Sequence, residues 1–201
     1  MNKQSILYTI IFTFVVSFIF VTVLALANTS TEEQVALNQQ LNRQRAILNA
    51  LNVEYNGAQE VLRKFENVDQ VDRNGMTLFR TRVEGETVFA KEFTGSGLWG
   101  EINGILAVTQ DLDRTVGLEI LSHNETPGLG GRIDEPWFKQ QFRNERIVDG
   151  TVDVTSAGDG DTNHDNGEVD AITGASRTSD SMRTIISAEL STLSSVLGGN
   201  S

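Results

Sequence analysis

The sequence of 201 residues contains no cysteine. Disulfide bonds, thiolate metal sites and cysteine-ligated iron–sulfur clusters are therefore excluded. Basic side chains are also scarce, because 16 lysines and arginines stand against 27 aspartates and glutamates, which gives a net charge of -11. Nucleic-acid binding is disfavoured, since contacts with phosphates need clustered lysine and arginine. The length fits one soluble domain, and its acidity fits a domain displayed beside a membrane but not lying flat on anionic lipid.

Charge is absent from residues 6–27, whose only polar side chains are those of tyrosine, threonine and serine. An apolar run of this length can cross a hydrocarbon core as a helix. Ala25-Leu26-Ala27 also resembles the cleavage site of a signal peptide, so removal of the segment remains an alternative. The length of the run favours a retained transmembrane helix.

The charges beside this run predict its orientation. Lys3 precedes it, and Glu32 and Glu33 follow it. By the positive-inside rule, the N-terminus is cytoplasmic and the domain extracytoplasmic, on the periplasmic side of a cell inner membrane. We therefore expect four segments, which are a short cytoplasmic N-terminus (1–5), a transmembrane helix (6–27), a helical stalk (28–55) and the extracytoplasmic domain (56–201).

Leucines at positions 37, 41, 48 and 51 form one stripe of the predicted stalk. The stripe can pair with a helix of another protein chain or pack on the chain's own domain, and both alternatives stay open. Beyond the stalk, the periodicity predicts short helices over residues 58–65 and 135–142. Strands are predicted over residues 77–83, 87–93, 102–109, 115–121 and 146–155. The fold class is therefore α+β, an antiparallel sheet with helices packed on it.

A short polar stretch, Asp170 to Ser179, precedes an amphipathic helical pattern. The hydroxyl residues Ser176, Thr178 and Ser179 lie where the N-cap of that helix is expected. A helix start offers unpaired backbone N–H groups to an anion, and Arg177 adds a positive charge. The stretch is a candidate anion site with a nucleophilic or acceptor hydroxyl, or else an ordinary strand–turn–helix junction.

Asp170, Thr173, Gly174, Ala175 and Ser176 occupy the fixed positions of Asp-x-x-(Ser/Thr)-Gly-Ala-(Thr/Ser). This pattern resembles the acceptor motif of proteins that carry FMN on a hydroxyl through a phosphoester bond. The resemblance implies covalent FMN on Ser176, installed by a dedicated flavin transferase that uses FAD as donor. Threonine is the usual acceptor, so serine is a departure that leaves the same chemistry open.

The stretch Glu125-Thr126-Pro127-Gly128-Leu129-Gly130 strengthens the resemblance. It is similar to a stretch of two related families of FMN-binding proteins from ion-pumping complexes. These are the NqrC family, from the Na+-translocating NADH:quinone oxidoreductase, and the RnfG family, from the Rnf complex. The resemblance implies an electron-transfer protein that works with other membrane subunits. Backbone N–H groups of this loop are expected to bond the flavin ring, and Glu125 and Thr126 to contact the ring or the ribityl chain.

A glycine-rich loop, Gly95 to Gly100, contains Leu98 and Trp99. It has neither the spacing nor the lysine of a phosphate-binding fingerprint. Its Gly-Leu-Trp sequence looks more like the NqrC branch than the Rnf branch, which remains the alternative. Trp99 can pack against an aromatic ligand or lie in the core.

Residues for other chemistry are few. His123 and His164 have no partners for a catalytic triad or a zinc site, and no general acid or base is evident, so no catalytic residue is expected. The alternating oxygen-bearing side chains of Asp159, Asp161, Asn163 and Asp165 resemble an EF-hand-like calcium loop. Histidine replaces its glycine and aspartate its closing glutamate, which favours a solvated acidic loop. An unmodified membrane-anchored scaffold and a calcium-binding domain remain alternatives of another class.

Overall fold

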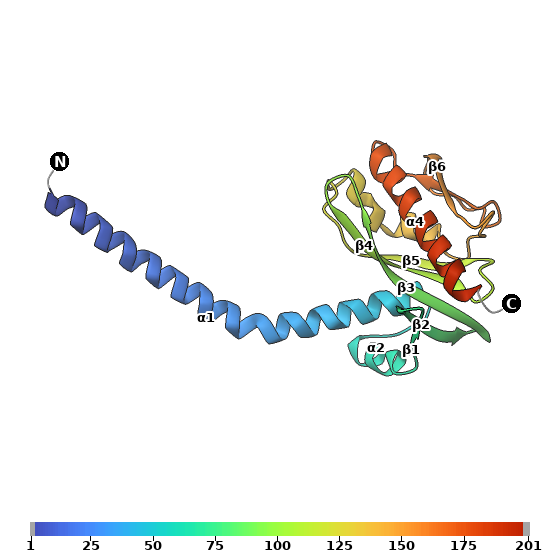
Figure 1. Cartoon of the computed structure of the whole chain (residues 1–201), viewed down its shortest axis with the longest axis horizontal. Coiled ribbons are helices and arrows are strands. Elements are labelled where there is room, and N and C mark those ends of the chain that lie inside the picture. Colours follow the sequence, from blue (N-terminus) through green and yellow to red (C-terminus); the bar gives the residue numbers. More distant parts are fainter. Residues whose placement is uncertain (1–2, 199–201) are drawn as a thin grey trace. The chain divides into compact units, whose positions relative to one another are not determined.

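The computed structural model describes residues 3–198, from the first helix to the last (Figure 1). Helix α1 (Lys3–Ala50) is continuous, and the chain divides after Asn42 into two compact units. In the first unit, nearly all side chains from Ile6 onward are exposed. Within the described residues, one helix is long and apolar enough to cross a membrane, and it contains this segment. The expected N-terminal apolar helix is confirmed, and it supports a membrane anchor.

The second unit is built on an antiparallel meander of five strands in chain order. These are β1 (Asp69–Arg73), β2 (Met76–Val83), β3 (Glu86–Ser96), β4 (Glu101–Thr109) and β5 (Thr115–Ser122). The hairpins that join β1 to β2 and β2 to β3 each turn on two residues of positive φ, Asn74-Gly75 and Glu84-Gly85. Such turns match the twist of paired strands, so they fix the register of the sheet.

Successive residues of β2 and β3 enter two separate cores, one on each face of the sheet. Leu78 and Phe89 belong to the core beneath α4 (Ser176–Leu197), which lies across one face of the sheet (Figure 1). Phe79 and Val88 belong to the opposite core, together with the last turns of α1. Helix α2 (Ala58–Phe65) packs on that second core through Phe65. The predicted α+β class, an antiparallel sheet with packed helices, is confirmed.

The last turns of α1 are part of this domain. Ile47, Leu48 and Leu51 are fully buried, whereas Leu37 is half exposed. For the C-terminal half of the leucine stripe, the structure therefore favours packing on the chain's own domain. The compact unit begins at Arg43 rather than at residue 56.

Four shorter elements complete the domain. They are η1 (Gly130–Asp134), α3 (Pro136–Gln140), β6 (Asp153–Ala157) and β7 (Glu168–Ala171). Strands β6 and β7 pair in parallel and form a small second sheet.

The predicted strand over residues 146–155 is wrong. Val148 and Thr151 close a tight turn through reciprocal backbone hydrogen bonds of 2.9 and 3.0 Å. Asp149 and Gly150, between them, both have positive φ. This conformation reverses the chain, so the strand starts only at Asp153.

Candidate functional site

Ser176 is exposed and is the first residue of α4. Strand β7 ends at Ala171, and the turn that follows closes with the Ala175 N–H donating to the Ile172 carbonyl at 3.0 Å. Gly174 has a φ of +81°, a conformation that side chains with a Cβ rarely adopt. The glycine of the acceptor motif therefore allows the turn that places the Ser176 hydroxyl in solvent.

None of the three predicted hydroxyls caps α4. The N-cap is Ala175, and its side chain makes no capping hydrogen bond. Ser179 is buried, and its Oγ donates to the Ala175 carbonyl at 3.1 Å and accepts the Ile172 N–H at 3.1 Å. The N-cap prediction is therefore wrong. The Ser179 hydroxyl bonds to the backbone of Ile172 and Ala175 in the acceptor turn, and the Thr178 hydroxyl bonds to Glu125. No side chain caps the first backbone N–H groups of α4.

The buried partner of Thr178 is Glu125, whose side chain is 4% exposed. Its Oε2 accepts the Thr178 hydroxyl at 2.5 Å. Its Oε1 accepts the backbone N–H groups of Leu98 at 2.8 Å and of Trp99 at 3.0 Å. One carboxylate thus joins the loop after β3, the loop after β5 and the first turn of α4.

Gly97 and Gly130 leave room for this carboxylate because they lack a Cβ atom. A Cβ on Gly97 would lie 2.5 Å from Glu125 Oε1, and a Cβ on Gly130 would lie 2.7 Å from Oε2. Both distances are below any real Cβ contact, so the segments pack too closely for a larger residue. The sequence indicated neither Thr178 nor Gly97 as part of this contact, although both lie within motifs that it singled out.

An exposed apolar edge lies on these loops. Leu98, Trp99 and Leu129 are 39%, 67% and 47% exposed. Leu129 also reaches the acceptor turn, because its Cδ2 is 3.6 Å from where a Cβ of Gly174 would stand. Placing Trp99 in the core is therefore wrong, since its side chain projects from the loop. The structure brings the two sequence motifs together at one site.

The loop from Thr126 to Gly131 is held by its own backbone. The Thr126 carbonyl accepts the N–H groups of Leu129 at 3.1 Å and of Gly131 at 3.0 Å. Gly128 has a φ of +73°, and Thr126 itself is exposed. The Leu129 N–H is thus already used within the loop, whereas the Thr126 side chain faces solvent.

The Asp170 side chain accepts a hydrogen bond from the acidic loop. Its Oδ2 accepts the Gly160 N–H at 2.9 Å, and its backbone N–H donates to Gln141 Oε1 at 2.7 Å. The same Gln141 oxygen accepts the Asp161 N–H at 2.7 Å. Asp170 therefore fixes the acidic loop against α3, which is a structural role within the folded domain.

Two of the four proposed calcium ligands, Asp161 and Asp165, are engaged in other bonds. Asp161 accepts the Asn163 N–H at 2.8 Å and the Asn166 side-chain amide at 2.7 Å. Asp165 forms an ion pair with Arg114, which holds the pKa of its carboxyl below the usual range. Among residues 3–198, no group of three or more histidine, aspartate or glutamate side chains is placed to hold a metal ion. The geometry therefore lends the calcium hypothesis no support.

A second buried carboxylate, that of Glu145, lies under the acidic loop and is 1% exposed. It accepts the Gly167 N–H at 2.9 Å, and its other oxygen lies 3.3 Å from His164 Nδ1. Burial raises the pKa of Glu145 above its ordinary value. This carboxylate belongs to the support of the acidic loop and not to the acceptor site.

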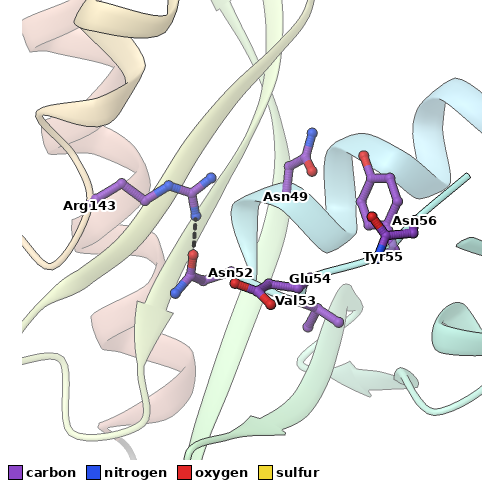
Figure 2. A pocket seen from close by; sticks show the side chains of 7 residues that line it. All are labelled: Asn49, Asn52, Val53, Glu54, Tyr55, Asn56 and Arg143. Carbon is purple, nitrogen blue, oxygen red and sulfur yellow. Dashed lines mark hydrogen bonds between the residues drawn. The ribbon is translucent and has the colours of Figure 1, made fainter.

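A cavity of about 440 Å³ lies near the end of α1, where no sequence pattern indicated one. Figure 2 shows Arg143 reaching Asn52 there, with Nη1 donating to Asn52 Oδ1 at 3.4 Å. Burial lowers the pKa of the Arg143 guanidinium. The remaining lining residues are Asn49, Val53, Glu54, Tyr55 and Asn56. None of the residues predicted for the acceptor site lines this cavity.

Comparison with known proteins matches residues 97–191 to the family described as FMN-binding domain. The NqrC protein of the Na(+)-translocating NADH-quinone reductase of Neisseria meningitidis is 36% identical over 89 residues, covering 42% of this chain and 33% of the relative. The corresponding protein of Pseudomonas aeruginosa is 35% identical over 96 residues, covering 42% and 34%. The chain thus spans about a third of the length of these relatives.

Solved structures show the same fold. NqrC from Parabacteroides distasonis has a TM-score of 0.64 at 21% identity, covering 84% of this chain and 98% of that one. NqrC from Shewanella oneidensis has a TM-score of 0.64 at 19% identity, covering 75% and 92%. Residues 97–191, which match the FMN-binding domain family, contain every residue of the acceptor site described above.

Proposed function

We propose that this chain carries FMN covalently on Ser176 and relays electrons as a subunit of a Na+-translocating NADH:quinone oxidoreductase. The observation that carries the proposal is the exposed Ser176 hydroxyl, at the start of α4 and beside the apolar edge of Leu98, Trp99 and Leu129. The relatives of similar sequence bear the name of a subunit of that complex.

The residues present fit the two ends of FMN. A phosphoester at Ser176 would meet the uncapped N–H groups and the positive dipole end of a 22-residue helix. Arg177 adds a charge, and it lines an open cleft of about 350 Å³ with Ser96, Asp180, Ser181 and Thr184. The apolar edge offers one face for the ring system, since flat aromatic ligands pack on exposed leucine and tryptophan.

The attachment step balances with FAD as donor. The Ser176 oxygen bonds to the flavin-side phosphorus of FAD, and the diphosphate bond breaks. AMP leaves, and the hydroxyl proton passes to a base of the flavin transferase. The exposure of Ser176 supports this step, because an outside enzyme must reach the hydroxyl.

Bound FMN would supply reversible uptake and release of electrons. The chain's own residues then have to hold the ring at a surface where redox partners approach. The exposed apolar edge meets this need, and the apolar part of α1 would tether the domain near the other membrane subunits. We place the N-terminus in the cytoplasm and the domain on the extracytoplasmic side, from Lys3 and the acidic residues after the apolar run. The Rnf complex is the alternative assembly for the same electron-relay role.

The test is mass spectrometry of the chain made in cells that contain a competent flavin transferase. The expected peptide contains Ser176 and is heavier by one FMN less one water. Fragmentation should place the added mass on Ser176 and not on Thr173. An unmodified peptide, from cells in which a control acceptor protein is flavinylated, would refute the covalent attachment.

A further inference from the structure

The buried Glu125 carboxylate couples the acceptor helix to the loops that carry the apolar edge. Its two oxygens accept three hydrogen bonds, from the Leu98 N–H, the Trp99 N–H and the Thr178 hydroxyl. An ionised carboxylate only accepts, so three donors from the protein occupy most of its capacity. With 4% of its surface exposed, little of Glu125 remains for a ligand.

Ser176 and Thr178 lie in the same turn of α4 but face opposite ways. Ser176 is exposed, whereas Thr178 is 1% exposed and bonds to Glu125. Two residues along a helix are separated by about 200°, which explains the opposite orientations. The Thr178 hydroxyl therefore ties the helix that presents the acceptor to the loop after β3.

Glycines at two positions allow this close contact. A Cβ on Gly97 would also lie 2.9 Å from Ile102 Cγ1 and 3.0 Å from the Gly100 carbonyl. A Cβ on Gly130 would meet the Thr178 hydroxyl and Glu125 Oε2. No space remains for a Cβ atom at either glycine, so the three segments pack directly around the carboxylate.

We propose that Glu125 and Thr178 form a latch that sets the position of the loop at residues 97–100 relative to Ser176. They are positioning residues for the flavin site, and they act through the Leu98 and Trp99 backbone rather than by touching the cofactor. The functional meaning of the latch rests on the proposed attachment of FMN to Ser176, whereas the latch itself is a property of the flavin-free chain.

The first test is hydrogen exchange on the full flavin-free chain, read by mass spectrometry at the Leu98 and Trp99 amides. Thr178→Val removes the hydroxyl but keeps the shape of the side chain. We expect these two amides to exchange about tenfold to a hundredfold faster. This factor corresponds to loss of the hydrogen bond from Thr178 to the Glu125 carboxylate, which holds both amides. Thr178→Ser restores the hydroxyl and should return the exchange to the wild-type rate.

Thr192→Val is the matched control. Its hydroxyl donates to the Ala188 carbonyl of the same helix, at 2.8 Å, so its loss should leave the two loop amides unchanged. Unchanged exchange in β4 shows that each variant is folded. If Thr178→Val speeds the loop amides no more than Thr192→Val does, the latch is refuted.

The second test is visible circular dichroism of the flavin-loaded chain, which reports the surroundings of the ring. We expect Thr178→Val to change the flavin band, and Thr178→Ser to restore it. Faster loop exchange in a chain that never acquires flavin would support the latch and count against the proposed function. Flavin on Ser176, with loop exchange and flavin band unaltered by Thr178→Val, would refute the latch and leave the function standing.

Discussion

Replacing Ile47 by alanine tests whether the end of α1 belongs to the domain. The Ile47 side chain is fully buried in the core that contains Phe79 and Ile105. Isoleucine-to-alanine changes at such sites cost about 2–5 kcal/mol, from lost burial and the cavity left behind. For a domain of this size, 1 kcal/mol shifts the melting temperature by roughly 2–4 °C. We therefore expect Ile47→Ala to lower the melting temperature by about 4–20 °C.

Leu37→Ala is the control within the same helix. Leu37 is 50% exposed, so its truncation should change the unfolding free energy by less than about 0.5 kcal/mol. The assay is thermal unfolding of the full chain in detergent, followed by tryptophan fluorescence. Trp137, which packs against the core on the other face of the sheet, reports the unfolding of the whole domain. Equal melting temperatures for the two variants would refute the conclusion that the domain starts before residue 56.

Three further predictions concern the site and its support. Burial raises the pKa of Glu145, so the folded chain holds that proton more tightly than the unfolded chain, and the contribution of Glu145 to the unfolding free energy falls as pH rises above about 4.5. Glu145→Gln should lack this fall in denaturant titrations between about pH 4 and 7, and an unchanged slope would contradict the assignment. Gly130→Ala should lower the unfolding free energy by about 1–3 kcal/mol through overpacking. The loss should be smaller in a Thr178→Ala background, because the Thr178 hydroxyl oxygen that a Cβ at Gly130 would meet is absent there. Strictly additive losses in denaturant titrations would argue against the contact. Trp99→Ala should leave the melting temperature nearly unchanged and alter the flavin spectrum, because the side chain is exposed; a large drop in melting temperature would show that Trp99 supports the fold.

Most of the central sheet could be predicted from the sequence. Strands β2 to β5 are rich in apolar and β-branched residues, and glycines mark the turns after β2 and β3. Strand β1 was missed because its sequence, Asp-Gln-Val-Asp-Arg, has a single apolar residue and depends on pairing with β2. The strand predicted over residues 146–155 ignored Asp149-Gly150, which is itself a turn signal.

The site was predictable only in its local parts. The motifs around Ser176 and Glu125 are continuous in sequence, so their residues could be named. The hydrogen bonds of Glu125 join residues 27 and 53 positions apart, and no local pattern indicates such contacts. For the same reason, the exposure of Trp99 and the inward direction of Thr178 required the structure.

The central claim is that FMN is attached to Ser176. In-gel flavin fluorescence after denaturation in SDS tests it, with the chain co-expressed with a flavin transferase. We expect a fluorescent band near 22.1 kDa for the wild type, for Ser176→Thr and for the control Ser194→Ala, an exposed serine at the far end of α4. Ser176→Ala should give a band of equal protein and no fluorescence. Fluorescence that survives in Ser176→Ala, or a dark wild-type band beside a fluorescent reference acceptor, would contradict the claim.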